Sequence, residues 1–219
     1  MKKLLTLIFV LLVFTVSSGF KYSTIEDDGF DINDLYDYQK KFKSEEIDTC
    51  AIGETKSYMD YRSTTDPSSA QYWFIRNDTE VDEKTGFLLD KDGFIGVALG
   101  SFYGTIGDRY YFTLDSGVVL PVVKIEEKAD KDTDNSGCYH LSDGSVMEFV
   151  IDSDRANNYF GYYRNGLVLQ GNYANYKLFN GGFIKVEKVF DELRDDYVSY
   201  EDDEEVITNH SLFNYASGY

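Results

Sequence analysis

The sequence is poor in the residues that many nucleophilic and metal-dependent enzymes need. Among its 219 residues are two histidines, two cysteines, two prolines and one tryptophan. His140 and His210 are too few for a zinc site with several imidazole ligands. The chain also lacks a Gly-x-Ser-x-Gly motif and a phosphate-binding glycine-rich loop. These absences exclude the commonest serine-hydrolase, zinc-enzyme and nucleotide-binding signatures.

Positive charge is scarce as well. The chain has 21 Lys and Arg against 39 Asp and Glu, a formal net charge of −18. Binding to nucleic acid needs clustered basic residues that neutralise phosphates, so nucleic acid is excluded as a partner. The same balance argues against attachment to anionic lipids or wall polymers and favours a neutral ligand or a cation bridge. Charge of one sign keeps a protein dispersed, so we expect a soluble monomer.

The N-terminus has the pattern of a secretory signal. Lys2 and Lys3 precede the apolar segment 4–16, and the small residues of 17–19 follow it. Such a segment is shorter than the roughly 20 residues of a membrane-spanning helix. We therefore predict a signal peptide over 1–19 and a secreted or cell-surface protein with no membrane attachment after cleavage. An uncleaved membrane anchor is the alternative.

Two cysteines, Cys50 and Cys138, leave two alternatives open. In an oxidising exported setting they form a disulfide, which would tie the N-terminal segment to a later loop. Otherwise they remain as two free thiols. The spacing of the two residues does not decide between these states.

Acidic segments flank a central region rich in predicted strands. Apolar residues recur at helical spacing between Asp31 and Glu46, which predicts an amphipathic helix in an acidic helical spacer over 20–55. The acidic, weakly apolar segment 191–219 is predicted to be a tail. The domain between them, 56–190, is predicted to be mainly β.

Short apolar or β-branched runs between turn residues predict the strands of this domain. The hairpin turn is expected at Asp115-Ser116-Gly117, and a short crossover helix at Asp152 to Phe160. The predicted strands are Gln71–Arg76, Phe94–Leu99, Tyr110–Leu114, Val118–Ile125, Val146–Ile151, Leu167–Gln170 and Phe183–Val189.

Three sequence pieces carry a resemblance to a known family: Thr113 to Gly117, Lys128 to Asp134, and Val146 to Asp152. Together they resemble the 3D domains of exported proteins of Gram-positive bacteria. Those domains are double-psi β-barrels distantly related to MltA-type lytic transglycosylases. The resemblance implies a double-psi-like β-barrel and a wall-associated role. It also places the second and third family acids at Glu126 and Glu148, with only Asp90 and Asp92 near the first.

The resemblance implies peptidoglycan, or another surface glycan, as the partner and a lytic transglycosylase as the candidate enzyme. Cleavage of a glycosidic bond needs a carboxyl group that holds its proton near neutral pH. Glu148 is the candidate for this acid, because its strand is otherwise apolar. Asp130 is the candidate partner, and Glu126 is the position that the resemblance indicates.

Two other functions compete with catalysis. A non-catalytic carbohydrate-binding module would use aromatic side chains such as Tyr61 and Trp73, although strand propensity also explains these residues. A calcium loop would use Asp130, Asp132 and Asp134, which stand at positions 1, 3 and 5 of an EF-hand-like pattern. Position 6 is Asn135 and position 12 is Leu141, so only half of that pattern is present. A purely structural exported protein is the third alternative.

Overall fold

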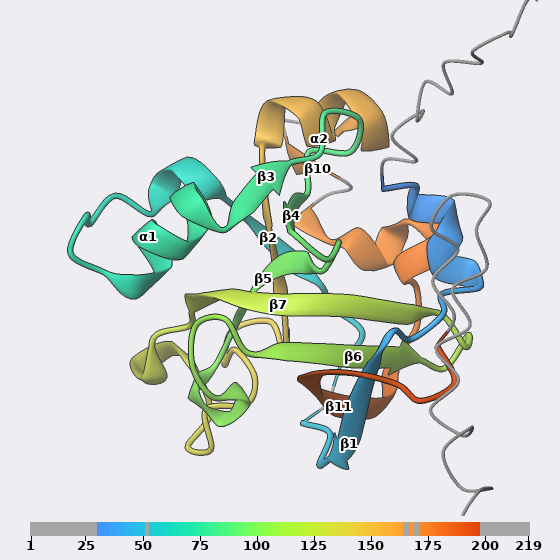
Figure 1. Ribbon diagram of the computed structural model, residues 1–219. Coiled ribbons are helices and arrows are strands. Elements are labelled where there is room, and N and C mark those ends of the chain that lie inside the picture. Colours follow the sequence, from blue (N-terminus) through green and yellow to red (C-terminus); the bar gives the residue numbers. More distant parts are fainter. Residues whose placement is uncertain (1–29, 51–52, 164–166, 169–170, 198–219) are drawn as a thin grey trace, which may run out of the picture.

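The computed structural model describes residues 30–50, 53–163, 167–168 and 171–197, and shows a mainly β protein (Figure 1). The predicted signal peptide and the end of the predicted tail, 198–219, lie outside these residues. Within them, no helix is long and apolar enough to cross a membrane. The strands are β1 (Phe42–Ile47), β2 (Ser57–Asp60), β3 (Thr79–Val81), β4 (Leu88–Asp90), β5 (Ile95–Leu99), β6 (Arg109–Leu114), β7 (Val119–Glu127), β8 (Glu148–Ile151), β9 (Tyr162–Tyr163), β10 (Leu167–Val168) and β11 (Phe183–Leu193). The α-helices are α1 (Ala70–Asn77) and α2 (Ser153–Phe160), and short 3-10 helices include η1 (Ile32–Tyr36), η2 (Tyr61–Ser63) and η4 (Asp130–Asp132).

Nine of the described strands form one mixed sheet. Its main path runs β1-β11-β6-β7-β5-β4-β3, and β8 pairs with both β5 and β2. The pairs β5–β7 and β2–β8 are parallel, and the other pairs are antiparallel. The prediction of a mainly β fold is confirmed. The described strands leave the sheet open, however, so they do not form the closed barrel that we expected.

Glycines permit two features of the centre of this sheet. The predicted hairpin turn joins β6 to β7, and Gly117 in that turn has φ of 88°, which a side chain would disfavour. In β5, Gly96 lies so close to β7 that an added Cβ would stand 2.3 Å from the Cδ1 of Ile125. Glycine at this position therefore allows the close approach of β5 and β7.

The predicted N-terminal helix over Asp31 to Glu46 is wrong beyond its first turns. The side chain of Asp31 caps η1, and β1 then pairs with β11 from Phe42 onward. The buried ring of Phe42 packs on Phe94. Long-range pairing thus overrides the local helical spacing of apolar residues. The segment predicted as a spacer contributes a strand to the same sheet as the predicted β domain.

The prediction of a strand over Gln71 to Arg76 is wrong, because this segment is part of α1. Ser69 caps this helix by accepting a hydrogen bond from the backbone N–H of Tyr72. Ile75 is its buried residue, as expected for a helix lying on a surface. The predicted crossover helix is confirmed as α2, which Asp152 caps. A Ser cap therefore outweighed the β propensity of four neighbouring aromatic and β-branched residues.

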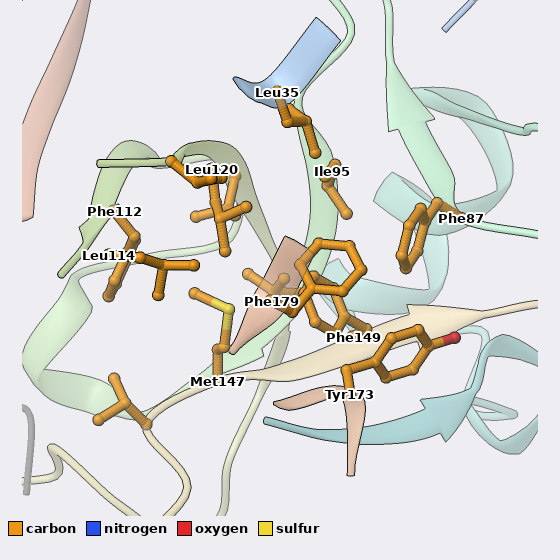
Figure 2. Close-up of a cluster of buried hydrophobic side chains, with 14 of the residues drawn as sticks. Leu35, Phe87, Ile95, Phe112, Leu114, Leu120, Met147, Phe149, Tyr173 and Phe179 are labelled. Atoms are coloured by element: carbon orange, nitrogen blue, oxygen red, sulfur yellow. The ribbon is translucent and has the colours of Figure 1, made fainter. Parts of the chain in front are cut away.

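The central strands of the sheet are buried on both faces. On one face the rings of Phe87, Phe149, Tyr173 and Phe179 pack together, with 5.1 Å between the centroids of Phe87 and Phe149 (Figure 2). Neighbouring strand residues point the other way, so Val150 belongs to a second cluster. That second cluster contains Phe42, Ile75, Leu88, Phe94, Ala98, Tyr111, Val123, Ile125, Val150 and Val189.

A disulfide joins Cys50 to Cys138, across a sequence separation of 88 residues. Of the two states that the sequence left open, the structure shows the paired one. The bond fixes the segment after β1 to the loop that follows η4. That loop carries His140, one of the residues that line the pocket described below.

Replacing both cysteines with serine should lower the free energy of unfolding by about 3 kcal/mol, because the bond restricts a long loop in the unfolded chain. Urea denaturation of the Cys50→Ser/Cys138→Ser variant would measure this loss. Wild-type protein under reducing conditions should show a similar loss. Equal stability of the oxidised and reduced proteins would contradict the prediction.

Candidate functional site

An acidic pocket lies where β5, β7 and β8 meet the segment after β7. Its volume is about 160 Å³, and it is open to solvent. In Figure 1, α1 and the loops that follow β7 lie on the same side of the molecule, near the end of β7. The residues that line the pocket are Met59, Ala98, Glu126, Glu127, Lys128, Ala129, Asp132, His140 and Glu148.

Strand register brings Glu126 and Glu148 to this pocket. Ala98 in β5 pairs with Glu126 on one side and with Glu148 on the other. Residues that pair directly across neighbouring strands project to the same face of a sheet. Neighbouring strands lie about 4.8 Å apart, so the two glutamates start about 10 Å apart across the small side chain of Ala98. Two of the three predicted catalytic residues are therefore brought together.

A register shift in β7 helps to place Glu126. Val97 pairs with Lys124, but the next residue, Ala98, pairs with Glu126 rather than with Ile125. The extra residue is a β-bulge, which changes the direction of the side chains that follow it. Ile125 and Ala98 both belong to the second hydrophobic cluster, so Glu126 emerges beside this cluster.

The carboxylate of Glu126 accepts hydrogen bonds from two side chains. Thr64 Oγ1 donates to its Oε2 at 3.2 Å, and Gln71 Nε2 donates to its Oε1 at 3.3 Å. Burial raises the pKa of Glu126, and the charges of Glu127 and Glu148 add to this effect; the two hydrogen bonds only partly oppose it. Glu126 is therefore protonated more readily than an exposed glutamate.

Glu148 lies next to a different set of groups. Ser57 Oγ donates to its Oε1 at 3.0 Å. Nearby, the buried Lys128 donates to the carbonyl oxygen of Ser145 at 2.9 Å and to its hydroxyl at 3.1 Å. Burial lowers the pKa of Lys128, while the charges of Glu148 and Asp143 act in the opposite direction. The pocket therefore contains a desolvated amine as well as its carboxylates.

The third glutamate of the pocket, Glu127, is neutralised. It pairs with the fully buried Lys124 at 2.5 Å, and Lys124 also donates to the carbonyl oxygens of Gly100 and Gly104. Within the described part of the chain, neither Glu126 nor Glu148 has such an ion pair. Of the three glutamates of the pocket, Glu126 and Glu148 are therefore the two that no lysine or arginine neutralises in this part of the chain.

The predicted aromatic residues, Tyr61 and Trp73, are not among the residues that line the pocket. Trp73 on α1 is 58% exposed, and Tyr61 belongs to η2. The guanidinium of Arg76 lies 5.1 Å from the ring centroids of both Tyr61 and Tyr72, and Tyr72 contacts Trp73 edge to face. We call these residues, 61, 72, 73 and 76, the aromatic stack. It is carried partly by α1, the helix whose Gln71 contacts Glu126.

The three predicted calcium ligands are placed separately. Asp130 is exposed and accepts a hydrogen bond from Ser101 Oγ at 2.8 Å, so it is not among the residues that line the pocket. Asp132 lines the pocket. Asp134 caps its own turn: it accepts hydrogen bonds from Ser136 and from the backbone of Cys138, which lowers its pKa to about 2. No group of three metal-ligating side chains suited to an ion is found in the described segments. The three aspartates of the half EF-hand pattern are therefore not gathered into one group of ligands in these segments.

Replacing Glu126 with Gln should stabilise the protein at neutral pH. Burial raises the pKa of Glu126 in the folded state, so its stabilising contribution is complete below the ordinary value of 4.5 and is lost as pH rises through the raised value. Thermal unfolding at pH 7 should show a higher melting temperature for Glu126→Gln than for wild type. The difference should shrink towards pH 4, and a lower melting temperature at pH 7 would contradict this account.

Several residues of the site carry no signal in the sequence. Lys128 lies inside one of the pieces that carry the family resemblance, but a lysine before an acidic loop usually indicates a solvated surface. Ser57, Thr64, Gln71 and Ser145 have no pattern that marks them. Only pairing between distant strands brings these residues to the two glutamates.

Comparisons of the chain with protein-family models, with curated proteins and with solved structures found no match.

Proposed function

We propose that the acidic pocket cleaves glycosidic bonds in peptidoglycan or another surface glycan. The observation that carries this proposal is the pairing of Ala98 with both Glu126 and Glu148, which places two carboxyl groups in one pocket. Glycosidases of the commonest types work with two carboxyl groups at the scissile bond. Carboxyl groups whose environments differ are suited to the separate roles of acid and base.

The environments of the two carboxyl groups favour Glu126 as the acid, whereas the sequence analysis nominates Glu148. Glu126, with its raised pKa, is the acid that protonates the leaving oxygen as the glycosidic bond breaks. Glu148 stabilises the positive charge that grows on the sugar carbon. In a lytic reaction, the ionised Glu126 then takes the proton of the sugar's own hydroxyl group while that oxygen closes the ring. The proton balance is restored, and no water is consumed.

The aromatic stack supports a glycan as the substrate. Sugar rings pack on exposed aromatic side chains, and Trp73 is 58% exposed on the helix that contacts Glu126. The net charge of −18 favours a neutral glycan over an anionic polymer. The stack would then hold the sugars next to the bond that the pocket cleaves.

The proposal includes the setting that the family resemblance implies. The protein acts outside the cell, in solution or at the surface, and its fold is a variant of the double-psi arrangement. Two parallel strand pairs, β5–β7 and β2–β8, within an otherwise antiparallel sheet support this topology, because parallel neighbours require crossover connections. The disulfide agrees with an oxidising environment.

The test is to incubate residues 20–219 with purified peptidoglycan and to analyse the soluble products by mass spectrometry. Anhydro-sugar ends would support a lytic reaction, and new reducing ends would indicate hydrolysis. Retention on insoluble glycan without cleavage, abolished by Trp73→Ala, would favour the binding module. The proposal would be overturned if the protein neither cleaved any surface glycan nor was retained on one.

A further inference from the structure

A line of four side chains connects the buried Lys128 with the carboxylate of Glu148. Lys128 Nζ lies 3.1 Å from the Oγ of Ser145, which lies 3.2 Å from the Oγ of Ser57, which in turn lies 3.0 Å from Glu148 Oε1. Ser145 is fully buried, and Lys128 and Ser57 are 4% and 9% exposed. We call this line the hydroxyl chain, and bulk water has little access to its members Lys128, Ser145 and Ser57.

Two arrangements of the hydrogens make the hydroxyl chain continuous from Lys128 to Glu148. An ammonium group only donates, an ionised carboxylate only accepts, and each hydroxyl donates one hydrogen. With charged Lys128 and ionised Glu148, every hydrogen must point from the lysine towards the glutamate. With neutral Lys128 and protonated Glu148, every hydrogen points the other way.

Passage between these two states transfers one proton along the chain. The ammonium gives a proton to Ser145, Ser145 gives its own to Ser57, and Ser57 gives its own to the carboxylate. Each hydroxyl loses one hydrogen and gains one, so the number of protons in the chain is unchanged. No oxidant, reductant or further reactant is involved.

We infer that Lys128 is a positioning residue for Glu148, acting through Ser145 and Ser57 to hold the carboxylate in place and to exchange a proton with it. This inference rests on the proposed function, because an acid–base cycle is the chemistry that such an exchange serves. Burial disfavours the charged form of the amine and so brings the two states of the chain closer in energy.

The charges around Lys128 determine what a test must control. The groups that act on its charge are Asp143 and Glu148. The acidic pocket also holds Glu126, Glu127, Asp132 and His140. Of these, Glu127 is the matched control, since it lines the same pocket but pairs with Lys124 rather than with the hydroxyl chain.

The experiment follows the titration of the Lys128 side chain by nitrogen NMR. It uses residues 20–219, without substrate. In Glu148→Gln the pKa of Lys128 should fall by about 1 pH unit, because an opposite charge is lost. In Ser57→Ala it should fall by part of that amount, since Ser145 is then no longer oriented by an acceptor. Ser57→Thr keeps the hydroxyl, so the pKa of Lys128 in this variant should equal the wild-type value. Glu127→Gln should also leave the pKa of Lys128 unchanged.

Two results would overturn the inference. One is an unchanged pKa of Lys128 in Glu148→Gln. The other is a fall in Glu148→Gln with none in Ser57→Ala, which would mean that the charges interact only through space. The readout needs no substrate, so it separates the two proposals. If the pKa of Lys128 changes as expected but no glycan is cleaved, the coupling through the hydroxyl chain is supported and the proposed function is contradicted. Circular dichroism of each variant establishes that it is folded.

Discussion

Glu126→Gln should lower the rate of glycan cleavage by at least two orders of magnitude while leaving the protein folded. A positioned general acid typically accelerates a reaction by about 10²- to 10⁴-fold, and an amide cannot supply the proton. The amide keeps the size of the side chain and can still meet Thr64 and Gln71, the partners of the carboxylate. The release of soluble glycan fragments, measured as an initial rate, gives the loss.

Two further variants make this test specific. Glu80→Gln removes an exposed acid of β3, which β4 and β5 separate from β8 in the sheet, and should retain full activity. Asp130→Asn should also retain most activity, because Asp130 bonds to Ser101 outside the pocket. A large loss in Asp130→Asn, with none in Glu126→Gln, would contradict the assignment from the structure.

The pH profile offers a third control. An acid works only while protonated, so cleavage by wild type should fall as pH rises through the raised pKa of Glu126. Activity should therefore be higher at mildly acidic pH than at alkaline pH. A rate that is independent of pH across this range would argue against Glu126 as the acid.

Local patterns predicted the central part of the fold well. The apolar run of β5, the hairpin between β6 and β7, and the capped helix α2 depend on short-range rules that the sequence displays directly. Gly117 and Asp152 mark the turn and the cap by residue type alone. Where neighbouring residues decide the conformation, the prediction and the structure agree.

Long-range strand pairing determines the parts of the fold and of the site that local patterns do not predict. The helical spacing of apolar residues before β1 is genuine, but the edge of β11 offers backbone hydrogen bonds that override it. The bulge opposite Ala98 leaves no mark in the sequence, yet it turns Glu126 into the pocket. The sequence could therefore nominate Glu126 and Glu148, but only their shared partner Ala98 shows that they meet.

Arg109→Met should lower the free energy of unfolding by about 3 kcal/mol or more, because it leaves the carboxylate of Asp90 buried without its partner. Arg109 Nε donates to Asp90 at 2.7 Å, and the guanidinium also bonds to Asp92. The same group lies 4.9 Å from the ring centroid of Phe94, so methionine keeps the apolar contact but not the charge. Urea denaturation at pH 7 would measure the loss.

The pH dependence and a double variant identify the cause of this loss. Burial raises the pKa of Asp90, so the contribution of this group is complete below its ordinary value and is lost as pH rises through the raised value. Without Arg109 the raised pKa rises further, so the deficit of Arg109→Met should be smaller at pH 4 than at pH 7. Asp90→Asn combined with Arg109→Met should be more stable than Arg109→Met alone, because no buried charge remains. The exposed neighbour Lys91, changed to Met, should have little effect. A deficit that is equal at both pH values and unrelieved in the double variant would mean that lost packing, rather than a stranded carboxylate, destabilises the sheet.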